Sequence, residues 1–327
     1  MKTLLMVVAL LLAVGGLVIF KFVGPGISVT KSSNIASATS SPVPPNDDRL
    51  TATLRKLCDK SGGKVSVAVL HVESGKLTVV DASNELPLFS VYKLPLAIAV
   101  LKDIEEGRLH LDQKVHVGPD DVVPGWRGNT RRWLKPIDLT IKQLLELSIV
   151  ESDNTSSEKL LQLTGGPAAV TGRMRSLDLQ QIDIRTTRKE YVAARSNPLT
   201  PQNTGSALGL VKLLSRLQVG ELLQNSATEL LLGLMERAKT GLRRLRGNLP
   251  PDTKVADKSG SGDPNPQTNL ASSTNDVGLI TLPNARGHLA MVVLLHDSTL
   301  PDEQQEKLIT DLARAAFDAY SSSSLPS

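Results

Sequence analysis

The stretch SVYKLPLAIAVL, residues 90–101, starts with polar side chains and continues as a strongly apolar run. This run predicts a helix over 91–106 that lies buried at the centre of the fold. Ser90 and Lys93 are three residues apart, so they lie on one face of that helix, one turn from each other. A lysine in a partly dry site loses its proton more easily, and the first turn of a helix offers free N–H groups to an oxyanion. The stretch therefore indicates Ser90 as a candidate nucleophile with Lys93 as its proton acceptor.

The Ser-x-x-Lys spacing alone is weak support, because it also occurs at Ser28, Ser61 and Ser156. Ser28 falls in a segment that we expect to be a tether, and Ser61 falls in a turn ahead of a strand. Ser156 falls on a polar helix face. Only Ser90 opens a strongly apolar helix, which singles it out among the four.

Strands are expected on both sides of a helical middle. Valines 65, 67 and 69 alternate with other residues, which predicts a strand over 64–72 that pairs with 76–80 across a turn at Gly75. Further strands are expected at 254–258, 276–282 and 288–295. Helices are expected at 48–61, 141–148, 155–163, 167–176, 205–217, 226–238 and 301–319. The fold class is therefore α/β: an antiparallel sheet of about five strands flanked by the terminal helices, beside an all-helical lobe, with a cleft between them.

The first 46 residues lie outside this pattern. Residues 4–20 are nearly all apolar, between Lys2 and Lys21, and are about long enough to cross a bilayer. The small residues at 36–38 lie too far along for a typical signal cleavage site, which favours an uncleaved anchor over a cleaved signal. We expect an anchor or signal at 1–25, a Ser/Pro-rich tether at 26–46, the catalytic domain at 47–320 and a disordered tail at 321–327. The domain would be exported to the periplasm or the extracytoplasmic face, with residues 4–20 as its only membrane contact.

Composition excludes several function classes. The charge is +4, from 37 basic and 33 acidic residues, and aromatic residues are 3% of the chain, so a nucleic-acid partner is not expected. The densest basic cluster, Arg243, Arg244 and Arg246, suits a solvated helix end. Cys58 is the only cysteine and suits a small packed residue of a helix, so neither an internal disulfide nor a Cys-rich metal site can form. We predict no metal and no cofactor.

Two further motifs contain polar groups suited to catalysis. Ser152-Asp153-Asn154 falls in a loop between two expected helices, where an N-cap is the alternative interpretation. Lys258-Ser259-Gly260-Ser261-Gly262 follows a strand. There Lys258 can attract a carboxylate, and the N–H of Ser261 can donate to an oxyanion. A glycine-rich strand end without function is the alternative.

Glu190 is the only acid between Asp183 and Glu221, and it stands among several basic residues. The surrounding segment, 186–203, has little periodicity. A long irregular loop of this kind is commonly functional. A salt-bridge partner is the alternative interpretation of this glutamate.

The order Ser-x-x-Lys, Ser-Asp-Asn, loop Glu and Lys-Ser-Gly resembles that of the class A serine β-lactamases. The resemblance extends over 47–320 and includes Gly165-Gly166-Pro167 and Leu249-Pro250. The stretch TNDVG at 274–278, together with the form of the loop up to Asn203, looks most like the branch that includes the PER and CfxA enzymes.

The resemblance implies a role for each of these residues. Ser90 would be acylated by the lactam carbonyl with help from Lys93, and Ser152 would pass a proton to the lactam nitrogen. Asn154 would hold the substrate's side-chain amide, and the N–H groups of Ser90 and Ser261 would form the oxyanion hole. Lys258 and Ser259 would engage the substrate carboxylate, where Arg244 could add charge, and Glu190 would activate the water for deacylation.

One position departs from the family. Many members have Asn four residues after the loop glutamate, whereas this chain has Ala194, which puts the rate of deacylation in question. The alternatives are a D-Ala-D-Ala peptidase or transpeptidase acting on cell-wall peptides, and a sensor of β-lactams or muropeptides that does not hydrolyse them. We expect a monomer.

Overall fold

The structure is a computed structural model, and it describes residues 48–123, 130–194, 197, 199–264 and 270–322. Its main sheet has five antiparallel strands in the order β2-β1-β10-β9-β8. Their bounds are β1 Lys64–His71, β2 Lys76–Val80, β8 Val255–Ser261, β9 Ser273–Thr281 and β10 His288–His296. The expected five-stranded sheet, built from both ends of the chain, is confirmed.

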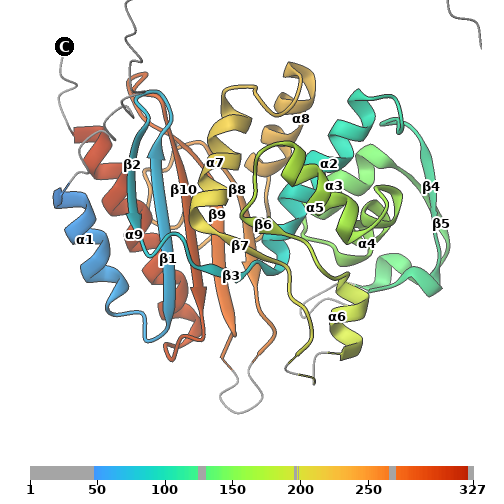
Figure 1. The fold of residues 1–327 in the computed structure, drawn as a ribbon, viewed down its shortest axis with the longest axis horizontal. Helices are drawn as coiled ribbons and strands as arrows, with labels where there is room; N and C mark the ends of the chain where they lie inside the picture. Colours follow the sequence, from blue (N-terminus) through green and yellow to red (C-terminus); the bar gives the residue numbers. More distant parts are fainter. Residues whose placement is uncertain (1–47, 124–129, 195–196, 198, 265–269, 323–327) are drawn as a thin grey trace, which may run out of the picture. The chain divides into compact units, whose positions relative to one another are not determined.

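Two layers of helices cover this sheet (Figure 1). α1 (Asp48–Cys58) and α9 (Asp302–Ser322) pack side by side on one face. α7 (Ala207–Gln218) packs on the other face, against β1, β9 and β10. The alternation of β1 matches these layers, since Val67 and Val69 belong to the core under α1 and α9 whereas Ala68 belongs to the core on the α7 side.

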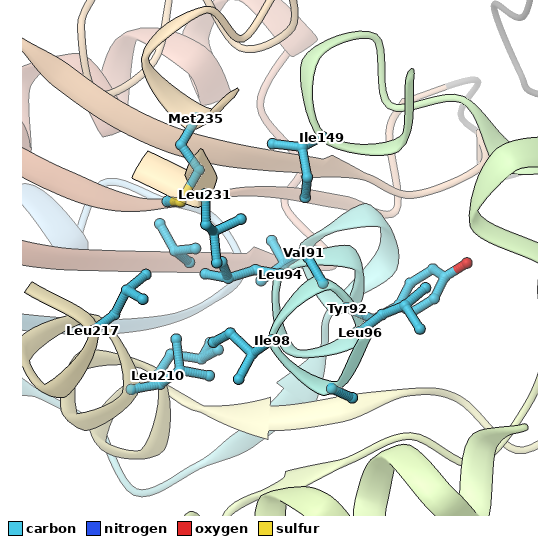
Figure 2. Close-up of a cluster of buried hydrophobic side chains, with 14 of the residues drawn as sticks. Val91, Tyr92, Leu94, Leu96, Ile98, Ile149, Leu210, Leu217, Leu231 and Met235 are labelled. Atoms are coloured by element: carbon cyan, nitrogen blue, oxygen red, sulfur yellow. The ribbon is translucent and has the colours of Figure 1, made fainter. Parts of the chain in front are cut away.

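The helical lobe is built around α2 (Lys93–Glu105), which follows the short 3-10 helix η1 (Phe89–Tyr92). Its other helices are α3 Ile141–Val150, α4 Asn154–Leu163, α5 Pro167–Ser176 and α8 Asn225–Glu236. In Figure 2, Leu94 and Ile98 of α2 point toward leucines of α7 and α8, while Tyr92 and Leu96 lie on the opposite side of the helix. Ten of its residues are buried, which confirms the predicted central helix.

The structure also contains short elements that the sequence did not indicate. A three-stranded sheet has the order β3 (Glu85–Pro87), β7 (Thr204–Ser206) and β6 (Ile182–Asp183), and β4 (Lys114–Val117) pairs with β5 (Ile137–Thr140). Two further 3-10 helices are η2 (Pro119–Asp121) and η3 (Thr130–Trp133). The segment expected to be irregular contains a short helix, α6 (Arg188–Ala194). These elements have two to seven residues, too few for a hydrophobic period to be recognised.

The predicted anchor at 4–20 and the tether at 26–46 lie outside the described residues. Among the helices that the structure describes, none has the length and apolar character needed to cross a membrane. The last helix ends at Ser322, slightly beyond the expected start of the tail at 321. Most of that tail, 323–327, is also outside the described part of the chain.

Candidate active site

Ser90 is held in a turn that the sheet fixes in place. Phe89, just before it, has a left-handed backbone with φ 46°, a conformation that costs a non-glycine residue about 1–3 kcal/mol. Asn275 of β9 donates its side-chain N–H groups to the carbonyls of Pro87 and Leu88, at 2.8 and 3.3 Å. Gly260 of β8 approaches so closely that a Cβ there would lie 2.5 Å from the Leu88 carbonyl oxygen. The sheet therefore imposes the strained turn that presents Ser90.

Lys93 begins α2 and is fully buried. Its ammonium donates to Asn154 Oδ1 at 2.8 Å, to Ser152 Oγ at 3.2 Å and to the Ser152 carbonyl. Burial holds the pKa of Lys93 well below its usual range, and the like charges of Lys258 and Arg188 act in the same direction, against the opposing effect of Asp153. The side chain is therefore suited to accept a proton, as predicted from the Ser-x-x-Lys spacing.

Ser152 lies between α3 and α4, with a left-handed backbone at φ 56°. Asp153 is the N-cap of α4 and accepts from the N–H of Ser156 at 2.7 Å. The capping interpretation is therefore right for Asp153. It does not exclude the functional one, because Ser152 and Asn154 on either side of it both bind Lys93.

Lys258 lies on β8 and is also fully buried. Its ammonium donates to Ser152 Oγ at 3.0 Å and to the Ser259 carbonyl at 2.8 Å. Burial, together with a smaller effect of the Arg244 charge, lowers the pKa of Lys258 to about 7, against the opposing effect of Asp276. Ser259 donates to Thr240 at 2.8 Å.

Arg244 is not at a solvated helix end, and that prediction was wrong. It lies in the turns after α8 and is only 7% exposed. Its guanidinium donates to the carbonyls of Gly260 and Asn275 at 2.9 and 2.8 Å, to Ser261 Oγ at 2.7 Å and to Glu306 at 3.3 Å. Residue spacing could not reveal this contact, because its partners come from β8, β9 and α9.

A cleft of about 850 Å³ lies over these groups. Ser90, Ser152, Asn154, Ser259 and Ser261 all line it, together with Arg244. Lys93 and Lys258 are buried beneath its surface. In the described part of the chain, no cluster of three or more His, Cys, Asp or Glu side chains could hold a metal ion.

Glu190 does not line this cleft, and unlike Lys93 and Lys258 it is not buried beneath it. Its carboxylate is exposed and accepts from the N–H of Thr187 at 2.9 Å and from the Thr186 hydroxyl at 3.3 Å. The Thr187 hydroxyl in turn accepts from the N–H of Glu190 at 3.0 Å, so the two residues form a capping box for α6. The bond from the N–H of Thr187 is the main cause that lowers the pKa of Glu190. Its assignment as the deacylating base stays a prediction.

Asn203 has a role that the sequence did not reveal. Its side-chain oxygen accepts from the N–H groups of Arg185 and Thr186 at 2.8 and 3.0 Å, and its amide donates to the Thr186 carbonyl at 3.1 Å. Its own carbonyl accepts from the N–H of Leu88 at 2.8 Å. Asn203 therefore joins the two ends of the 186–203 segment to the turn that carries Ser90.

The model of the β-lactamase enzyme family matches residues 49–320. The chain belongs to this family. The β-lactamase VEB-1 of Pseudomonas aeruginosa is 29% identical over 275 residues, which are 84% of this chain and 91% of VEB-1. The extended-spectrum β-lactamase PER-1 of the same species is 29% identical over 255 residues, 77% of this chain and 81% of PER-1.

Solved structures agree with this assignment. A crystal structure of a β-lactamase from Chitinophaga pinensis is 31% identical, with a TM-score of 0.79 over 83% of this chain and 99% of that one. The predicted resemblance to the class A serine β-lactamases is thus confirmed, as is the two-lobed fold. The protein is a serine hydrolase of β-lactams, an activity that inactivates these antibiotics.

Proposed function

We propose that this β-lactamase opens its substrate through an acyl-enzyme on Ser90. The Ser90 hydroxyl adds to the lactam carbonyl, and its proton passes to Lys93, whose low pKa leaves it able to accept one. The N–H groups of Ser90 and Ser261 stabilise the oxyanion that forms. The observation that carries this proposal is that Ser90 and Ser152 line the same cleft, and that Ser152 Oγ accepts from both Lys93 and Lys258.

Ser152 is proposed to deliver the proton to the lactam nitrogen. Its oxygen accepts from both Lys93 and Lys258, so its own hydrogen must point elsewhere. The cleft is the open direction, since Ser152 lines it. A proton given to the nitrogen is replaced from the adjacent ammonium group, and the C–N bond breaks.

The cationic end of the cleft suits an anionic substrate. We assign the substrate carboxylate to Lys258 and Ser259, with Arg244 adding positive charge from beside Ser261. The substrate's side-chain amide is assigned to Asn154, which lines the cleft at the start of α4. No metal or cofactor takes part in this scheme.

Hydrolysis of the acyl-enzyme needs a base for water, and Glu190 is proposed for this step. For Glu190 to act there, its carboxylate has to leave the capping box with Thr187 and turn into the cleft. Ala194 provides no side-chain amide to hold the water. We therefore expect this step to be slower than acylation.

We further propose that the protein is a monomer that works outside the cytoplasm, in the periplasm or on the extracytoplasmic face. The support is the apolar run at 4–20 and the Ser/Pro-rich segment at 26–46, which suit a membrane anchor and a tether to the catalytic domain. The anchor is tested by treating membranes with a salt wash or with detergent and following the protein. An inserted segment keeps the protein with the membrane after the salt wash, whereas detergent extracts it.

The test of the mechanism is turnover of benzylpenicillin and a chromogenic cephalosporin, with intact mass followed in parallel. We expect sustained hydrolysis by the wild-type protein. The Ser90→Ala variant should show neither hydrolysis nor an adduct. A single stoichiometric burst with a persistent adduct would support acylation of Ser90 but contradict the proposed deacylation. The protein would then behave as a penicillin-binding peptidase or a sensor.

A further inference from the structure

An exposed leucine lines the cleft close to the groups assigned to the substrate carboxylate. Leu242 lies in the turns after α8, and it is 53% exposed. It belongs to neither hydrophobic core of the described residues. A single exposed leucine is common on protein surfaces, so its place in the cleft matters more than its exposure. There, a ligand that covers this apolar side chain gains the free energy of removing it from water.

The turn that carries Leu242 is packed against Ser259. The hydroxyl of Thr240 accepts from Ser259 Oγ at 2.8 Å. Gly241 approaches so closely that a Cβ there would lie 2.6 Å from the Ser259 Cβ. Ser259 is one of the two residues that we assign to the substrate carboxylate. Leu242 therefore comes directly after the contact that borders the carboxylate end of the cleft.

The course of this turn shows on which side of the carboxylate Leu242 lies. The turn starts beside the helical lobe, where the N–H of Lys239 donates to the carbonyl of Val150 at 2.8 Å, two residues before Ser152. It ends at Arg244, whose guanidinium binds carbonyl groups of β8 and β9. Leu242 follows the contact with the sheet, so it lies on the side that faces away from Ser152.

The charged groups next to Leu242 already have partners. Arg243 and Arg244 both donate to Glu306, at 2.8 and 3.3 Å. A substrate group that reaches this part of the cleft meets paired charges and the apolar side chain of Leu242. The surroundings therefore favour an apolar group here.

The ring substituent beside the carboxylate is the part of a cephalosporin that can reach Leu242. The ring carbon that bears the carboxylate has two ring neighbours. One is the lactam nitrogen, which we assign to Ser152, and the other is the carbon that carries the substituent. The substituent therefore lies next to the carboxylate and away from Ser152, on the side where the turn carries Leu242.

We propose that Leu242 is a specificity-determining residue that favours β-lactams with an apolar ring substituent beside the carboxylate. This inference rests on the proposed orientation of the substrate. Leu242 covers the substituent with apolar surface and takes no part in the chemistry at Ser90. Its loss should therefore lower activity on a substrate with a large apolar substituent more than on one with a small substituent.

The test uses two cephalosporins with the same acyl side chain, one with a methyl and one with a propenyl ring substituent. Neither substituent leaves when the ring opens, so leaving-group chemistry does not differ between them. The full-length protein is compared with Leu242→Ala, Leu242→Asn and Leu242→Met. Val219→Ala is the matched control, because Val219 is 54% exposed at the end of α7 and does not line the cleft. The measurement is the ratio of kcat/KM for the propenyl substrate to kcat/KM for the methyl one.

We expect Leu242→Ala to lower this ratio about threefold, because the two additional carbons of the propenyl group lose apolar contact. Leu242→Asn should lower it at least as much, since it places a polar group against the substituent. Leu242→Met keeps a flexible apolar side chain and should leave the ratio within about 1.5-fold of wild type. Val219→Ala should leave it unchanged. Equal losses for the two substrates, or an unchanged ratio in Leu242→Ala, would overturn the inference.

Failure of the proposed function gives a different result. Because kcat/KM reports the steps up to acylation, a persistent adduct would refute deacylation alone, and the ratio would then be taken from acylation rates by intact mass. If the wild-type protein forms no acyl-enzyme with either cephalosporin, the proposed function fails and the inference fails with it. Normal acylation with a ratio that does not depend on residue 242 would refute only the inference.

Discussion

Lys93 of α2 and Lys258 of β8 donate to one acceptor, the hydroxyl oxygen of Ser152, at 3.2 and 3.0 Å. One lysine comes from the helical lobe and the other from the sheet, so Ser152 joins the lobes at the floor of the cleft. Two ammonium groups this close and this well buried oppose each other's charge. Burial is the largest cause that lowers the pKa of each. The charge of Lys258 lowers the pKa of Lys93 further, and for Lys258 the second lowering charge is that of Arg244.

The Ser152→Ala variant removes this shared acceptor. We expect kcat to fall by about 10²–10⁴, the usual contribution of a positioned proton donor, with a smaller change in KM. The matched control is Ser176→Ala, which removes a hydroxyl bonded to the Arg173 carbonyl at the end of α5. Steady-state kinetics with benzylpenicillin provides the measurement. A kcat within twofold of wild type would refute the proton-transfer role.

The pKa of Lys258 leads to a prediction of how substrate binding depends on pH. Its pKa of about 7 means that it is charged below that pH and neutral above it. KM for an anionic β-lactam should therefore be low at pH 6 and rise as the pH passes through about 7 toward 9. Lys258→Arg keeps a charge throughout this range and should remove the rise, whatever its effect on kcat. A wild-type KM that stays flat from pH 6 to 9 would contradict the assignment.

Glu190 has two roles to separate, the capping of α6 and the activation of water. If it activates water, Glu190→Gln should stall the enzyme as an acyl adduct visible by intact mass. Thr187→Ala breaks the same capping box but leaves the carboxylate, so it should lower stability by about 0.5–2 kcal/mol and still deacylate. Equal turnover by the two variants would mean that Glu190 only caps the helix.

Gly260 lets β8 pass close to the turn that carries Ser90. In Gly260→Ala the new Cβ would lie 2.5 Å from the Leu88 carbonyl oxygen, so strand or turn must move. We expect acylation to slow more than tenfold and stability to fall by about 1–3 kcal/mol. Gly172→Ala in α5 is the control, because its Cβ meets nothing within 4 Å and should add about 0.5–1 kcal/mol of stability. Stopped-flow acylation and thermal unfolding test both variants.

The sequence predicted the helices and strands in which apolar residues recur with a clear period. β2 and α5 have the predicted bounds, and the alternating valines of β1 face the core under α1 and α9. The Ser-x-x-Lys, Ser-Asp-Asn and Lys-Ser-Gly motifs meet at one cleft. The first motif lies at the start of α2 and the second between α3 and α4. The Lys-Ser-Gly motif lies within β8, and not after a strand as predicted, because β8 continues to Ser261.

Three features could not be predicted, for a common reason. The hydrogen bonds of Arg244, those of Asn203 and the ion pair of Arg188 with Asp263 join residues that are distant in sequence. The hydrophobic period says nothing of such contacts, since it reports only which face of one element is buried. The hydrogen bonds of Glu190 are a fourth case, because the capping box belongs to α6, a helix too short to be predicted from its hydrophobic period.

The pairing of β1 with β10 has a consequence for synthesis of the protein. Val69 lies opposite Met291, so the centre of the sheet joins residues roughly 220 positions apart. A chain growing on the ribosome has β1 and β2 long before β10 exists, and a lone hairpin is marginal in water. A product truncated before β10 therefore lacks the central strand and the helix that packs beside α1. Premature termination near the end of the message would thus be expected to yield no partly active enzyme.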